Sequence, residues 1–166
     1  MAEPKVFSIS RIVDAPQELV WRAWTEKEHL MKWFGPQGVT LTYSDMDFRP
    51  GGHLHSCIQT PDGVEMWAKL IYQEIHPTDR LVYITTFSDK NGGITRHPLS
   101  PTWPLEMLTT ISLANENGKT KLTLEWKPVN ASSEEIATFN MAYDGMTQGW
   151  TGTFDQLTAY LADIQR

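Results

Sequence analysis

The pattern of apolar and polar positions changes several times along the chain, and each change predicts a different type of element. Residues 6–13 form a short run rich in β-branched side chains, which predicts a first strand. Apolar side chains then recur on one helical face between Leu19 and Trp24, which predicts a short helix. A second short helix is expected to begin at the capping-box sequence Thr25-Glu26-Lys27-Glu28 and to end at Gly35-Pro36.

From residue 39 to residue 127 apolar and polar side chains alternate, as they do in strands with one buried face. The runs with this alternation are residues 39–48, 53–59, 64–75, 80–87, 105–114 and 119–127. Turn sequences such as Pro61-Asp62-Gly63 and Asn117-Gly118 separate consecutive runs, and such short connections imply antiparallel pairing. The segment 88–104 is rich in proline and glycine, which predicts a mobile loop over one edge of the sheet, and loops of this length are often lids.

The last segment predicts one amphipathic helix of about thirty residues. It opens with a second capping-box sequence, Ser132-Ser133-Glu134-Glu135. Its apolar stripe, with spacings of three and four residues, consists of Ile136, Phe139, Tyr143, Met146, Trp150, Phe154, Leu157 and Leu161. Three glycines stand inside the stripe, so that either the helix bends or breaks there or the missing side chains leave room beside it; they are Gly145, Gly149 and Gly152.

Length and composition narrow the class of protein. A chain of 166 residues suits a single domain, here residues 1–166, with a core that needs no disulfide or metal. The formal net charge is −6 and no run of Lys or Arg occurs, which argues against nucleic-acid binding. Cys57 is the only cysteine, so no intrachain disulfide is expected. Without a signal-peptide pattern or a membrane-spanning apolar stretch, we expect a soluble cytoplasmic protein, either a monomer or a homodimer.

Several short motifs, in a fixed order, resemble those of a known family. They are Arg11-Ile12-Val13-Asp14-Ala15-Pro16, Val20-Trp21-Arg22-Ala23-Trp24, Trp33-Phe34-Gly35-Pro36, Phe48-Arg49-Pro50-Gly51-Gly52, Glu74-Ile75-His76-Pro77 and Gly149-Trp150. Together with the order of elements, they resemble the helix-grip fold of the START-like (SRPBCC) superfamily. Within it, the chain is similar to AHSA-type proteins, which are related to the activator of the ninety-kilodalton heat-shock chaperone's ATPase.

The resemblance implies an α+β fold of the birch-pollen-allergen type. A seven-stranded antiparallel curved sheet would follow from it, with two short helices after the first strand and a long C-terminal helix across the concave face. The superfamily includes lipid and hormone carriers, polyketide cyclases and domains that act on other proteins. Three functions therefore stay open: binding of a small hydrophobic or amphipathic ligand, a cyclase-like or hydratase-like activity, and activation of a chaperone ATPase or another stress-response interaction.

The large number of aromatic residues favours the first of these functions. Seven tryptophans are more than an ordinary core needs, and such rings line pockets that hold apolar ligands. Alternation places Leu122, Leu124 and Trp126 toward the helix. The side chains that we predict to line a cavity between sheet and helix are Trp33, Phe34, His55, Trp67, Tyr83, Phe87, Trp103, Met107, Thr109, Met146, Trp150 and Phe154. The partner would then be a small apolar molecule.

Motifs that would carry a specific chemistry are sparse. His53, His55 and Cys57 alternate along one strand and therefore share a face, which could suit a transition metal. No further ligand appears at a suitable spacing, so we expect neither a metal nor a cofactor. A catalytic reading would need His55 close to a buried carboxylate such as Glu106, and the sequence contains no recognised nucleophile or phosphate-binding motif. We therefore expect a binding protein rather than an enzyme.

Overall fold

The computed structural model describes residues 5–34, 38–97 and 100–166. The strands are β1 (Phe7–Val13), β2 (Thr40–Asp47), β3 (His53–Gln59), β4 (Glu65–His76), β5 (Arg80–Ser88), β6 (Ile94–Thr95), β7 (Met107–Glu116) and β8 (Lys119–Pro128). The helices are α1 (Gln17–Thr25), α2 (Lys27–Trp33), α3 (Ser133–Met141) and α4 (Tyr143–Ile164). The seven strands and the two short helices after β1 were predicted from the sequence, whereas β6 was not.

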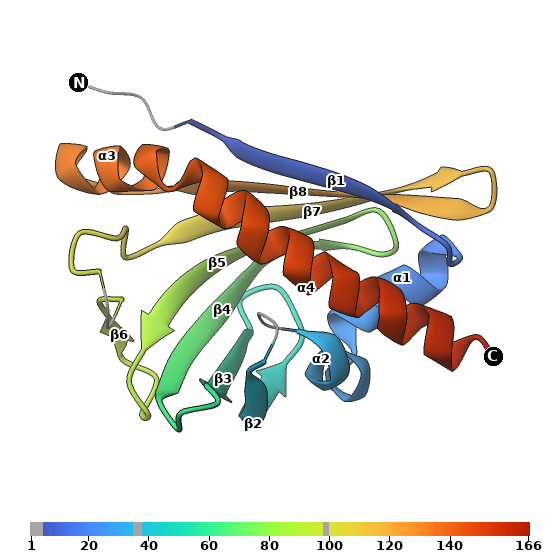
Figure 1. Cartoon of the computed structure of the whole chain (residues 1–166), viewed down its shortest axis with the longest axis horizontal. Helices are drawn as coiled ribbons and strands as arrows, with labels where there is room; N and C mark the ends of the chain where they lie inside the picture. Colours follow the sequence, from blue (N-terminus) through green and yellow to red (C-terminus); the bar gives the residue numbers. More distant parts are fainter. Residues whose placement is uncertain (1–4, 35–37, 98–99) are drawn as a thin grey trace.

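The strands form one antiparallel sheet, and α4 lies across one of its faces (Figure 1). The order of the strands is β1-β8-β7-β5-β4-β3-β2, and the short β6 pairs with β5. Consecutive strands are mostly neighbours, as the short turns between them predict. The predicted α+β class, with a curved open sheet and a long C-terminal helix across it, is confirmed.

The two faces of the sheet can be followed from strand to strand, because residues paired directly across an antiparallel ladder point to the same side. We call the face that α4 covers the inner face. On β7 it carries Met107, Thr109, Ile111 and Leu113, all of which are buried. The opposite, outer face carries the residues between them, which are only partly buried: Leu108, Thr110 and Ser112.

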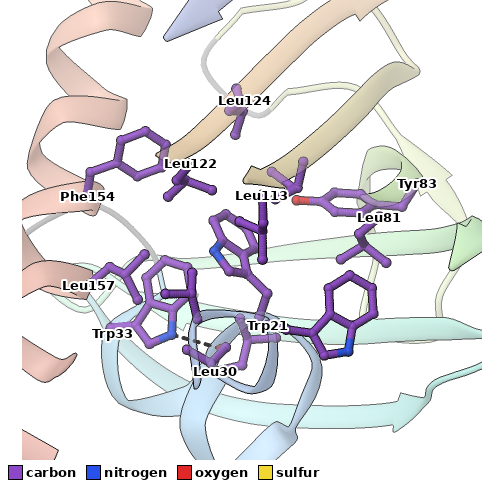
Figure 2. Close-up of a cluster of buried hydrophobic side chains, with 14 of the residues drawn as sticks. Trp21, Leu30, Trp33, Leu81, Tyr83, Leu113, Leu122, Leu124, Phe154 and Leu157 are labelled. Carbon is purple, nitrogen blue, oxygen red and sulfur yellow. Dashed lines mark hydrogen bonds between the residues drawn. The ribbon is translucent and has the colours of Figure 1, made fainter. Parts of the chain in front are cut away.

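The core lies between the inner face and the helices (Figure 2). Leu122 and Leu124 of β8 meet Phe154 and Leu157 of α4 there, and none of these four side chains is exposed to solvent. Burying each of them stabilises the fold by about 1.5–3 kcal/mol relative to exposure. Trp33 of α2 completes this end of the core, and its indole nitrogen donates a hydrogen bond to Ala23 O at 3.0 Å.

The C-terminal segment is two helices rather than the single helix that its stripe predicts. The chain leaves helical geometry at Ala142, with φ −90° and ψ 5°, between α3 and α4. The predicted glycines do not cause this break, because Gly145 and Gly149 lie inside α4. A Cβ atom at either glycine would meet nothing within 4 Å, so no other element packs against them.

The two capping-box sequences behave differently. The Ser132–Glu135 box is confirmed at the start of α3, where the Ser132 hydroxyl accepts from the Glu135 amide and the Glu135 carboxylate accepts from the Ser132 amide. The prediction that the Thr25–Glu28 sequence caps the second helix is wrong. Thr25 ends α1, its hydroxyl donates back to Trp21 O at 2.9 Å, and α2 begins after Glu26 without a side-chain cap.

The segment 88–104 is more regular than a loop. Ser88 completes β5, a turn closes with a hydrogen bond from Asp89 N to Gly93 O, and β6 then pairs with the end of β5. The expectation that this segment contains no strand is therefore wrong. Two positions lie outside the described residues: the predicted helix stop at Gly35-Pro36 and Pro98 in this segment.

Side chains of the helices also contact β1. The backbone amide of Lys5 donates to Asn140 Oδ1 at 2.9 Å, and that of Ser8 donates to Tyr143 Oη at 3.5 Å. Arg11 forms an ion pair with Asp155 of α4 at 2.6 Å. Within the described residues, no helix combines the length and apolar character that crossing a membrane requires.

Candidate functional site

A row of hydrogen-bonding side chains crosses the centre of the inner face. The pairing register places Tyr72 of β4 opposite Tyr83 of β5, Tyr83 opposite Thr109 of β7, and Thr109 opposite Trp126 of β8. We call these four residues the polar row. Tyr72, Tyr83 and Thr109 are 2% exposed or less, and Trp126 is partly buried. The register therefore brings three hydroxyl groups and one indole N–H beneath the helices.

Two groups of the polar row lack a hydrogen-bond partner. Thr109 is satisfied, since its hydroxyl lies 3.1 Å from that of Thr85. Tyr72 Oη and Trp126 Nε1 are buried, and neither has a partner among the described residues. Burial raises the pKa of the Tyr72 phenol, and also that of Tyr83, so both phenols stay neutral and able to donate. The polar row thus contains two unused donors.

Aromatic rings form a continuous band along the same side of the sheet. Successive members of this band lie 4.6–6.4 Å apart between ring centroids, in contact geometry for aromatic pairs. We call it the aromatic wall; its members in order are Phe87, His97, Trp103, Trp126, Trp150 and Phe154. Phe154 is fully buried, whereas the other members are partly exposed. Burial lowers the pKa of His97, which favours a neutral imidazole in the wall.

The segment that carries His97 and Trp103 is fastened to α3. Arg96 forms an ion pair with Glu135, and its guanidinium also donates to Trp103 O at 3.5 Å. Thr138 of α3 donates a hydrogen bond to the Thr102 hydroxyl at 2.9 Å. The Ser132 amide, followed by Arg96, lowers the pKa of the Glu135 carboxyl, so this acid is ionised at neutral pH. Trp103 is in this way held against Phe139 and Trp126.

The structure brings many of the predicted pocket residues together. Tyr83 and Thr109 belong to the polar row, and Met107 lies beside it, paired with Thr85. Phe87, Trp103, Trp150 and Phe154 belong to the aromatic wall, and Met146 is buried on α4. These residues come from β5, β7, α4 and the segment after β6, and they share the side of the sheet that α4 covers.

Trp33 and Phe34 form a separate cluster at the end of α2. Their rings lie 5.5 Å apart, and Trp33 packs edge-to-face on Trp24 at 4.8 Å. Gln156 of α4 donates to Trp33 O at 3.3 Å. The gap beside Phe34, bounded also by Leu41 of β2, encloses only about 10 Å³, which hardly holds one water molecule. This end of the inner face is therefore closed by packing.

His55 and Trp67 lie on the outer face, so their predicted place between sheet and helix is wrong. His55 pairs with Lys69, and Trp67 pairs with Cys57, on the side of the sheet that faces away from α4. The His55 imidazole lies 3.2 Å from Ser88 Oγ and 3.1 Å from Asp89 O, and its ring also contacts Trp67. Both residues form a local cluster there rather than part of the aromatic wall.

His53, His55 and Cys57 do share one face, as their alternation predicts. They do not converge on one point, because His53 Nε2 lies 3.0 Å from Asp45 while Cys57 Sγ lies 3.4 Å from Glu65. Burial raises the pKa of the Cys57 thiol, which disfavours the reactive thiolate. In the described part of the chain, no group of three or more His, Cys, Asp or Glu side chains could hold a metal ion.

Tyr72, Thr85 and His97 belong to the site, although no sequence pattern assigned them to it. Trp126 was predicted to point inward, but it was not assigned to the pocket. Tyr72 was missed because its face follows from its pairing with Tyr83, and the sequence contains no direct signal for that register. His97 lies in the segment that was expected to be an irregular loop, and only its contacts with Phe87 and Trp103 place it in the wall.

Comparison with solved structures gives the same class of fold. A protein from Nitrosomonas europaea is 25% identical, with a TM-score of 0.74 and 96% of each chain covered. A protein from Mycobacterium smegmatis is 20% identical, with a TM-score of 0.76 and the same coverage. The AHSA1 protein from Silicibacter pomeroyi is 16% identical, with a TM-score of 0.71, covering 95% of this chain and 98% of that one. None of the curated proteins is a significant match.

The fold is that of a helix-grip protein of the START-like class. The family described as "Activator of Hsp90 ATPase homolog 1-like protein" matches residues 14–162. The chain therefore belongs to this family, as the order of its motifs predicts.

Proposed function

We propose that the protein binds a small, mostly apolar molecule between the inner face and α4, and that this molecule carries a hydrogen-bond acceptor. The observation that carries the proposal is the pair of buried donors without partners, Tyr72 Oη and Trp126 Nε1. Leaving a buried polar group unpaired costs about 1–3 kcal/mol. A carbonyl, ether or hydroxyl oxygen of a ligand would remove this cost, because an indole N–H can only donate.

The surroundings of these donors favour an uncharged ligand. The aromatic wall and Met107 offer apolar surface, and the neutral hydroxyls of the polar row offer dipoles but no charge. Arg11, which lies 5.8 Å from the Phe154 ring, is already paired with Asp155. The partly exposed Trp103 and Trp150 are the side chains that would move to admit the molecule.

Binding of the uncharged fluorescent ketone prodan tests the proposal. Its naphthalene ring suits the aromatic wall, and its carbonyl can accept from either free donor. We expect saturable binding with a blue-shifted emission. Tyr72→Phe and Trp126→Phe each remove one donor and keep an aromatic ring at that position. The variant that loses the donor bound to the carbonyl should bind about tenfold more weakly.

Trp67→Phe is the matched control, because Trp67 is an aromatic residue of the same sheet that lies on the outer face. Its affinity for prodan should equal that of the wild type. Absence of saturable binding would contradict the proposal, and so would an affinity that neither Tyr72→Phe nor Trp126→Phe lowers relative to Trp67→Phe.

The geometry favours neither alternative function. His53 and His55 lie on the outer face, so the sheet separates their imidazoles from a molecule bound at the polar row. An interaction module would present a contiguous apolar patch. The exposed large apolar side chains of the described residues are instead distributed over several elements; they are Val6, Ile12, Met31, Tyr43, Val64, Ile94, Leu105, Met141 and Ile164.

A further inference from the structure

A larger recess lies on the outer face of the sheet, and Trp126 is the residue that it shares with the proposed inner site. It encloses about 490 Å³ over strands β5, β7 and β8. Its floor is β7, whose outward side chains Thr110 and Ser112 are short. Longer side chains stand on both sides, with Arg80 on β5 and Lys127 on β8. The hollow therefore follows from the difference in side-chain length between neighbouring strands.

The two ends of this hollow differ in chemistry. At one end Arg80 pairs directly with Ser112, and Thr110 lies two residues further along the same face. At the other end Leu108 pairs with Lys127, and Val6 adds a half-exposed apolar side chain. The five residues from Leu108 to Ser112 span about 13 Å along the strand. One end thus offers hydrogen-bond donors and a cation, and the other offers apolar surface.

The charges at the hollow are available for a ligand. The Arg80 guanidinium reaches Glu74 only at 4.0 Å, and Glu74 is also 3.2 Å from His76. Lys127 forms no ion pair within residues 5–34, 38–97 and 100–166. Two cations and one carboxylate, that of Glu125, line the hollow. This balance favours a ligand with a single negative charge.

We propose that the outer hollow binds an amphipathic monoanion, such as a medium-chain alkyl carboxylate. The carboxylate accepts hydrogen bonds from Arg80 and from the Ser112 hydroxyl, at the end of the hollow away from Glu125. The hydrocarbon chain lies along β7 toward Leu108 and Val6, covered by the aliphatic stem of Lys127. Glu125 pairs with Thr110 in the middle of the span, so a second anionic group on the chain would be repelled.

Titration with decanoate, followed by amide NMR spectra of the full chain, tests this site. We expect saturable shifts at Leu108, Thr110 and Ser112. Arg80→Gln should weaken binding by about tenfold or more, because it removes a charge-assisted pair. Lys121→Gln is the control, since it removes a cation on β8 that does not line the hollow, and it should leave the affinity unchanged.

Two further measurements separate this site from the inner one. Tyr72→Phe should bind decanoate like the wild type, because Tyr72 lies on the inner face. Decanol, which has the same chain without the charge, should bind at least about tenfold more weakly than decanoate. The proposal is overturned if decanoate gives no saturable shifts, if the shifts centre on Tyr72 and Trp150 of the inner side, or if Arg80→Gln and Lys121→Gln behave alike.

Discussion

The two faces of β7 are built from alternate residues of one strand, yet they differ in how far their side chains are buried. Met107, Thr109 and Ile111 on the inner face are at most 2% exposed, whereas Leu108 and Thr110 on the outer face remain partly open. The covering helix explains the difference, because α4 packs on one side only. A ligand on the inner face must therefore compete with packing, while a ligand on the outer face meets preformed space.

The largest expected contrast between the faces is in stability. Leu122→Ala on the inner face of β8 should lower the free energy of unfolding by about 2–5 kcal/mol, because it leaves a cavity in a fully buried site. Thr123→Ala, one residue further on and on the outer face, should cost less than about 1 kcal/mol. Urea denaturation of both variants measures the difference. Similar losses would show that the faces do not differ in packing as described.

A smaller contrast concerns ion pairs. Arg11 pairs with Asp155 and lies over the Phe154 ring, with its side chain 24% exposed. Arg11→Met should lower stability by about 1 kcal/mol, through loss of the pair and of the cation–π contact. Arg49→Met breaks a pair with Asp47 in which the arginine is 71% exposed, and it should have little effect. Thermal denaturation at low and high salt distinguishes the two variants. Equal losses of stability would contradict a larger contribution from the Arg11–Asp155 pair.

On the solvent side of α4 we expect a substitution that raises stability instead of lowering it. Gly149→Ala should raise stability by about 0.5–1 kcal/mol, because the glycine lies inside a helix and an added Cβ meets nothing within 4 Å. Gly118→Ala is the contrasting variant: its φ of +87° is one that alanine adopts poorly, so stability should fall. Chemical denaturation measures both. A loss in Gly149→Ala would mean that this side of α4 is covered.

The smallest expected effect concerns His97 and pH. Burial lowers the pKa of His97 below its ordinary value of 6.5, so the unfolded chain binds the proton more readily. Stability from this group is therefore complete above pH 6.5 and declines as the pH falls through the folded-state pKa. His97→Gln should make the pH dependence between pH 8 and 5 shallower. Unfolding curves across this range test it, and an unchanged slope would contradict a partly buried, neutral His97.

Periodicity predicted the fold well because burial on one face imposes a regular pattern. Leu122 and Leu124 were assigned inward from alternation alone, and both are fully buried. Local signals were less dependable. The Thr25 and Ser132 sequences follow the same capping pattern, yet only Ser132 caps a helix. Thr25 cannot do so because it belongs to the last turn of α1.

The candidate site was harder to predict, since faces depend on pairing between strands. Along β3 both Leu54 and His55 are buried, so burial along this strand does not alternate cleanly. The pairing of His55 with Lys69 decides its face, and the sequence contains no direct signal for that register. The same applies to Tyr72, whose partner Tyr83 places it in the polar row.

The contacts between β1 and the helices have a consequence for solubility at high concentration. β1 is an edge strand, and free backbone amides on an edge can pair with a strand of another molecule. Asn140 and Tyr143, which flank the break at Ala142, accept from the amides of Lys5 and Ser8. The junction of α3 and α4 thus occupies one backbone amide at the start of this edge strand and one just before it, and neither is available to a strand of another molecule.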